Sequence, residues 1–196
     1  MAQGERINLS ESTVLLIDDN ARSLDLLSSL FHGFGVKEQI KCESAAKAVE
    51  VLKTRPVDLV LVDCSMPDMD GHDLTRWIRR ETEAPLRYIP IIMLTGHAAQ
   101  SKVCKSRDSG ASFVVAKPLT PKVLLKRILW LGSDEREFVE CDSYVGPDRR
   151  VRNFGPPLGE PGRRSGDLST HVGQPAEANM DQSAIDMLMK PRRVVL

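Results

Sequence analysis

A continuous apolar run that ends in an aspartate is the feature that most constrains how this chain can fold. Residues 57–71 read Val-Asp-Leu-Val-Leu-Val-Asp-Cys-Ser-Met-Pro-Asp-Met-Asp-Gly, and no polar residue interrupts the run from Leu59 to Val62. Such a run is typical of a strand that is buried on both faces of a parallel sheet. The residues after Asp63 favour a loop. Because ligands bind at the carboxyl edge of such sheets, Asp63 is the first candidate functional residue.

Four other short apolar runs alternate with segments that have helical periodicity. The runs cover residues 13–17, 36–40, 91–94 and 113–116, and the second of them is the least apolar, as expected of a strand near an edge. Asn20 and Ser44 are placed to cap helices, and Pro121 suits the first turn of another. Five strands alternating with five helices predict an α/β fold, a doubly wound five-stranded parallel sheet with helices on both faces.

The composition indicates which partners and which cellular compartment to expect. Lys and Arg together number 27, as do Asp and Glu, so no overall field favours nucleic acid or an anionic membrane. The four cysteines form neither a CxxC pair nor a cluster at metal-ligand spacing, which favours free thiols in a reducing compartment. No apolar run approaches the roughly 20 residues that a membrane helix needs. We therefore expect a cytoplasmic protein that binds neither nucleic acid nor membrane.

The chain divides into three parts on the basis of composition. Residues 1–12 are polar and are expected to be flexible, and residues 13–132 carry the periodic pattern of one domain. Residues 133–196 are rich in proline and lack apolar periodicity, which predicts a mostly disordered tail with a short helix at 183–190. Within the tail, Gly-Pro-Asp-Arg-Arg at 146–150 is echoed at 160–164, and this repeat could be a docking motif or solvated charge.

Polar and charged residues terminate four of the predicted strands. Asp18 and Asp19 follow the first, Asp63 ends the third, Thr95 ends the fourth and Lys117 follows the fifth. In a doubly wound sheet these ends share one rim, where crowded carboxylates call for a cation such as Mg²⁺. A carboxylate in such a site can act as a nucleophile toward phosphorus. The hydroxyl and the ammonium could then contact phosphoryl oxygens.

With these residues and intervals, the segment up to Gly132 resembles a CheY-like response regulator receiver domain of two-component signalling. The resemblance implies a flavodoxin-like strand order 2-1-3-4-5 and Asp63 as the acceptor of a phosphoryl group from a histidine kinase or a phosphotransfer protein. It implies Mg²⁺ held by the carboxylates of Asp19 and Asp63 and by the backbone carbonyl of Ser65, with Asp18 assisting. Thr95 and Lys117 would bind the phosphoryl group.

One position departs from the family pattern. Many members carry a switching Tyr or Phe where this chain has Val114, and Phe113 lies on the opposite face of the strand. Thr95 would still reorganise the face made by the fourth helix, the fifth strand and the fifth helix. A weak homodimer through that face is one assembly that the resemblance allows.

We expect a response regulator whose output is binding to a downstream protein, with no enzymatic activity beyond its own phosphorylation and dephosphorylation. One alternative is a phosphohydrolase with an Asp nucleophile, but such an enzyme would want a second acid at position 65, which is Ser. The other alternative is a receiver-like interaction module that works without phosphorylation, for which the aliphatic residue at 114 is the one supporting feature.

Overall fold

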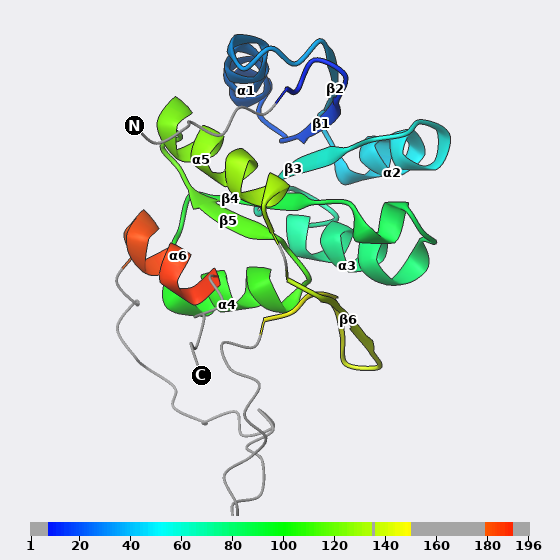
Figure 1. Cartoon of the computed structure of the whole chain (residues 1–196), viewed down its shortest axis with the longest axis vertical. Helices are drawn as coiled ribbons and strands as arrows, with labels where there is room; N and C mark the ends of the chain where they lie inside the picture. Colours follow the sequence, from blue (N-terminus) through cyan, green and yellow to red (C-terminus); the bar gives the residue numbers. More distant parts are fainter. Residues whose placement is uncertain (1–7, 135, 150–178, 190–196) are drawn as a thin grey trace, which may run out of the picture.

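The computed structural model describes residues 8–134, 136–149 and 179–189. Five parallel strands form one sheet in the order β2-β1-β3-β4-β5, which confirms the predicted fold class and strand order (Figure 1). These strands are β1 (Thr13–Ile17), β2 (Glu38–Cys42), β3 (Leu59–Asp63), β4 (Ile91–Thr95) and β5 (Phe113–Ala116).

Burial along the strands follows their place in the sheet. Every residue of β3 and β4 is buried, as the uninterrupted apolar runs predict for strands covered on both sides. The edge strand β2 buries only Cys42 fully. Val60 pairs with Ile91 and Asp63 with Leu94 in the parallel register of the two central strands, so their carboxyl ends lie side by side.

Helices cover both faces of the sheet (Figure 1). One core cluster joins alternate strand residues such as Leu16 and Leu61 to α1 and α5, and the other joins Leu15 and Val60 to α2 and α3. The helices of the domain are α1 (Ala21–Gly33), α2 (Ala45–Thr54), α3 (Gly71–Glu81), the 3₁₀ turn η1 (Leu86–Tyr88), α4 (Gln100–Asp108) and α5 (Pro121–Gly132). No helix in the described part of the chain is long and apolar enough to cross a membrane.

A β-hairpin follows α5, where the sequence predicts disorder. Its antiparallel strands are β6 (Phe138–Cys141) and β7 (Tyr144–Pro147). The hairpin packs on α3, where the buried guanidinium of Arg79 lies 5.3 Å from the Phe138 ring. The two strands are short and lack a clear alternation of apolar and polar residues, so the sequence does not indicate them. The helix on which they pack, α3, lies far away along the chain.

A last helix, α6 (Gln182–Met189), lies where the sequence predicts a short helix at 183–190. It runs beside α4 near β5 (Figure 1) and buries Ile185 and Met189 in the core cluster that contains β5 and α5. The expectations for residues 1–7, for the repeat at 160–164 and for the rest of 150–178 lie outside the described residues.

Candidate phosphoryl-acceptor site

The parallel sheet brings the polar strand ends to one rim. Asp18 directly follows β1, Asp63 and Thr95 are the last residues of β3 and β4, and Lys117 directly follows β5. Asp18, Asp63 and Thr95 are buried, whereas Lys117 is only partly covered. The rim therefore holds charged groups that are shielded from bulk water, where ion pairs are stronger than at an open surface.

A single ammonium connects the two buried carboxylates. Lys117 Nζ lies 2.5 Å from Asp63 Oδ1 and 2.8 Å from Asp18 Oδ2. Burial by itself lowers the pKa of Lys117, but the hydrogen bonds and negative charges of the two aspartates outweigh that effect, and its pKa is raised. Lys117 therefore stays protonated at physiological pH and serves as a fixed positive charge.

Asp18 is held by the start of α1 as well as by Lys117. Its Oδ1 accepts a hydrogen bond from the backbone N–H of Asn20 at 2.9 Å, and its Oδ2 accepts one from the Ser23 hydroxyl at 2.5 Å. Asn20 in turn caps α1 by accepting from the N–H groups of residues 22 and 23. The helix start therefore fixes the orientation of the Asp18 carboxylate.

Asp63 is oriented by the loop that follows it. Its Oδ2 accepts a hydrogen bond from the Ser65 N–H at 2.7 Å, and Gly71 N–H donates to the carbonyl of Cys64 at 3.2 Å. A Cβ atom on Gly71 would lie 2.2 Å from the carbonyl oxygen of Asp63, which no real contact allows. Glycine is therefore required where α3 begins, because the helix approaches the backbone of Asp63 so closely.

Two of the predicted site residues stand apart from this cluster. Asp19 is exposed at the rim. The hydroxyl of Thr95 donates to the carbonyl of His97 at 2.8 Å and accepts from the His97 N–H at 3.1 Å, so it is engaged with its own loop. A hydroxyl in this arrangement can exchange a backbone partner for a phosphoryl oxygen if a charged group arrives beside it.

The donor set suits a hard divalent cation only with help from the backbone and from water. Within the described residues, no three acidic, His or Cys side chains gather closely enough to hold a metal ion by themselves. Asp18 and Asp63 nevertheless share the single ammonium of Lys117, and Asp19 adds a third carboxylate at the exposed rim, which leaves an excess of negative charge. Mg²⁺ commonly takes one or two carboxylates and completes its shell with water, so these residues fit it.

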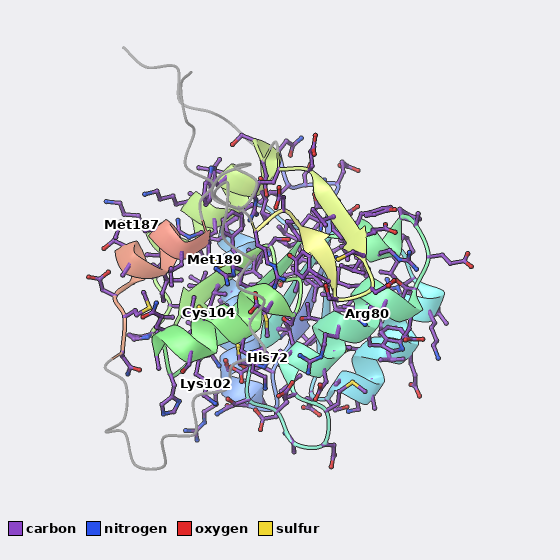
Figure 2. All side chains as sticks on the ribbon, turned by 90° about the horizontal axis from the view of Figure 1, so that it is seen from below. His72, Arg80, Lys102, Cys104, Met187 and Met189 are labelled. Carbon is purple, nitrogen blue, oxygen red and sulfur yellow. The ribbon has the colours of Figure 1, made fainter. Side chains whose placement is uncertain are left out.

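A cavity of about 370 Å³ opens beside the acceptor, on the side of α4. His72 of α3, labelled in Figure 2, is buried and lines this cavity, with its Nε2 3.0 Å from the Ser106 hydroxyl. Burial lowers the pKa of His72. Neighbouring Cys64 is also buried, which raises its pKa to about 11 and keeps it a thiol. Sequence spacing gives no sign of this cluster, because Cys64 follows β3, His72 lies in α3 and Ser106 lies in α4. The lining residues are Cys64, Ser65, Asp70, His72, Thr95, His97, Lys102, Lys105 and Ser106.

Comparisons of this chain with known proteins agree on one family. The sequence model described as the response regulator receiver domain matches residues 14–129. The Sensor protein GacS of Pseudomonas syringae pv. syringae is 33% identical over 142 residues, which are 68% of this chain but only 16% of that relative. This chain thus spans a small part of the sensor protein.

A smaller relative and a solved structure each match over most of their own length. The polar-differentiation response regulator DivK of Brucella ovis is 28% identical over 108 residues, which are 55% of this chain and 85% of DivK. The structure titled as the CheX-CheY-BeF3-Mg+2 complex from Borrelia burgdorferi is 24% identical, with a TM-score of 0.57, over 62% of this chain and 89% of that one. At that identity the likeness concerns the fold alone.

Proposed function

This chain belongs to the response regulator receiver domain family of two-component signalling, and we propose that it accepts a phosphoryl group on Asp63 from a histidine kinase or a phosphotransfer protein. The observation that carries this proposal is the contact of Lys117 Nζ with Asp63 Oδ1 at 2.5 Å, beside the buried carboxylate of Asp18. An acceptor carboxylate in this position has a fixed cation next to the oxygen that would receive the charged group.

The transfer is a displacement at phosphorus. A carboxylate oxygen of Asp63 forms a new bond to the phosphorus atom while the bond from phosphorus to the donor nitrogen breaks, and the imidazole of the donor leaves with the electron pair and takes a proton. Asp63 reacts as the carboxylate that forms the ion pair with Lys117, so no proton leaves it in the step. Lys117 would hold an oxygen of the arriving phosphoryl group by its charge.

Asp19, Asp63 and the carbonyl of Ser65, assisted by Asp18, would hold Mg²⁺. When bound, the ion supplies positive charge that offsets the crowding of carboxylate and phosphoryl oxygens. The remaining steps belong to the protein: Asp18 anchors Lys117, the Ser65 N–H orients Asp63, and Thr95 would exchange its bond to His97 for one to a phosphoryl oxygen.

Receiver domains are signalling modules rather than enzymes that turn over external substrates, and we propose that the output of this chain is binding to a downstream protein. We place the exchange in the cytoplasm. Supporting that choice, Cys42, Cys64, Cys104 and Cys141 are all free thiols, as is usual in a reducing compartment.

The test is incubation of the full chain with Mg²⁺ and acetyl phosphate, followed by intact mass. We expect a labile phosphoryl adduct that requires Mg²⁺ and is absent from Asp63→Asn. Asp68→Asn is the matched control, because Asp68 is exposed in the same loop and its φ of 65° is one that Asn also tolerates. An adduct that persists in Asp63→Asn, or no adduct in the unmodified protein, would overturn the proposal.

A further inference from the structure

The outer edge of β5 is covered by a side chain of α6. As the last strand of the sheet, β5 leaves backbone groups without a neighbouring strand. Gln182 supplies that neighbour: its Oε1 accepts from the N–H of Ala116 at 2.9 Å, and its Nε2 donates to the carbonyl of Val114 at 3.1 Å. One side-chain amide thus satisfies a donor and an acceptor that a second strand would otherwise bind.

The other side chains of α6 match the polarity of the surface on which the helix lies. Ile185 is fully buried and Met189 is 4% exposed, whereas Met187 is 66% exposed. Figure 2 shows Met187 on the outer side of α6. Asp186 forms an ion pair with Arg127 of α5, whose side chain is only 2% exposed. Among the described residues, two further nitrogens of Arg127 have no hydrogen-bond partner, so Asp186 is the charge that compensates this buried cation.

The segment that leads into α6 is bonded to the loop after Thr95. The N–H of Met180 donates to the carbonyl of Ala98 at 2.8 Å, and Asn179 forms an antiparallel bridge with Ala99. Thr95 bonds to His97 immediately before this point. A movement of Thr95 toward the acceptor would therefore shift a loop that helps to hold α6.

Coupling of Thr95 to α6 through this loop does not require a switching aromatic residue at position 114. Val114 is 1% exposed and β-branched, so its side chain has few alternative rotamers, and its carbonyl is one of the groups that Gln182 binds. Hydrogen bonds join Thr95 to His97 and Ala98 to Met180, so the loop at 97–99 links Thr95 to the segment that leads into α6. A site and a surface connected in this way can be coupled if the surface has two arrangements, with α6 seated or released.

We propose that α6 is a competitor within this chain: it occupies the surface made by α4, the edge of β5 and Arg127 of α5, here called the seat, and excludes a partner helix from it until Thr95 moves. The partner is a protein that presents an amphipathic helix of the same chemistry: an amide for the edge of β5, two aliphatic side chains, and a carboxylate for Arg127. Its dependence on Thr95 rests on the proposed phosphorylation; the identity of the surface does not.

The charge and burial of Arg127 favour a partner helix that carries a carboxylate over one that is only apolar. A partner without a carboxylate would leave the Arg127 cation buried and unpaired, which is strongly unfavourable. Because α6 belongs to the same chain, it competes at an effective concentration of up to about millimolar. A free helix must therefore bind tightly, or α6 must first be weakened, for exchange to occur.

The first experiment measures exchange with a fluorescent synthetic peptide of residues 179–189 as the probe, by anisotropy, on the full chain. Ile185→Asp in the protein vacates the seat, and Met187→Asp adds the same charge on the exposed side as the matched control. We expect Ile185→Asp to bind the peptide at least about tenfold more tightly than the unmodified protein or Met187→Asp, since affinity scales with the fraction of vacant seats. Equal binding by all three proteins would overturn the proposal.

A second measurement keeps the test valid if Ile185→Asp folds poorly. In Gln182→Ala, the amide of Ala116 should exchange with deuterium faster, while amides of β1 and β3 keep their protection. A peptide that carries Asp186→Asn should bind the vacated seat more weakly than the unmodified peptide. Unchanged protection of Ala116 together with equal binding of the two peptides would contradict the assigned contacts.

The third arm separates this inference from the proposed function. Beryllofluoride with Mg²⁺ should increase peptide binding by the unmodified protein and leave Asp63→Asn unchanged. If intact mass shows an acyl phosphate but peptide binding does not rise, the link through Thr95 is wrong. If no acyl phosphate forms, the proposed function fails, while the comparison of Ile185→Asp with Met187→Asp still decides the docking surface.

A concentration-dependent dimer of the unmodified protein that Ile185→Asp abolishes would identify a second copy as the occupant and overturn the proposed partner.

Discussion

Lys117 Nζ lies 2.5 Å from Oδ1 of Asp63, joining a residue that follows β5 to the last residue of β3 across the rim of the sheet. The intervening strand β4 ends in Thr95 between them in the strand order. The ion pair thus connects the two sides of the site, and it depends on all three strands having the same direction. Disturbing it should affect stability as well as chemistry.

Lys117→Met should lower the free energy of unfolding. The variant leaves the side chains of Asp18 and Asp63, which are 1% and 8% exposed, without their shared cation. Because Lys117 itself is 29% exposed, water offsets part of the loss, and we expect about 2 kcal/mol rather than the larger cost of a fully buried pair. Urea unfolding measures the change. Lys122→Met, on the exposed side of α5, should stay within about 0.5 kcal/mol of the unmodified protein, and a similar loss in both variants would contradict the role of the ion pair.

Gly71→Ala should be severely destabilising. The new Cβ would meet the backbone carbonyl of Asp63 at 2.2 Å, and a backbone atom cannot move aside as a flexible side chain can. We expect a loss of about 2 to 3 kcal/mol in urea unfolding, or failure to fold. Gly96→Ala is the control, since nothing lies within 4 Å of its Cβ position. Comparable stability of the two variants would show that the start of α3 can shift away from β3.

Tyr144→Phe tests whether the hairpin contributes to the stability of the domain. The buried Tyr144 hydroxyl donates to the carbonyl of Pro147 at 2.6 Å, and its removal should cost about 1 kcal/mol. Tyr88→Phe removes a comparable bond to Glu140 at 2.7 Å from a residue that is 47% exposed. Water can replace that second bond, so the change should be a few tenths of a kcal/mol. Chemical denaturation monitored by circular dichroism distinguishes the two, and a hairpin that unfolds separately would give two equal, small effects.

The strands of the domain could be predicted because their signals are local. The runs at 59–62 and 91–94 contain no polar residue, and only a strand covered on both faces buries such a run completely. The positions of the candidate site residues followed from the same reasoning, since parallel strands bring their carboxyl ends to one rim. The sequence did not predict which of these side chains turns inward: Asp18 is buried, whereas the neighbouring Asp19 is exposed.

The contacts of the C-terminal region could not be predicted, because each depends on a distant partner. The bond between Gln182 and Val114 joins residues that are 68 apart in sequence, and neither residue is distinctive by itself. The turn of the hairpin, Asp142-Ser143, is not among the dipeptides that mark tight hairpins most strongly. Arg79 appears in the sequence as one of several arginines on α3, yet it is 1% exposed and bonds to the carbonyls of Gly110 and Ile89.

Stability should fall as the pH drops below about 6.5, the usual pKa of a histidine in an unfolded chain. Burial lowers the pKa of His72 in the folded protein, although Asp70 partly opposes that effect. Between the folded and unfolded pKa values, the unfolded chain therefore binds more protons, so the contribution of His72 is present at pH 7 and is lost on acidification. We expect the free energy of unfolding, measured in urea from pH 7.5 to pH 5, to decrease less in His72→Gln than in the unmodified protein. An identical slope in His72→Gln and the unmodified protein would mean that folding does not lower the pKa of His72.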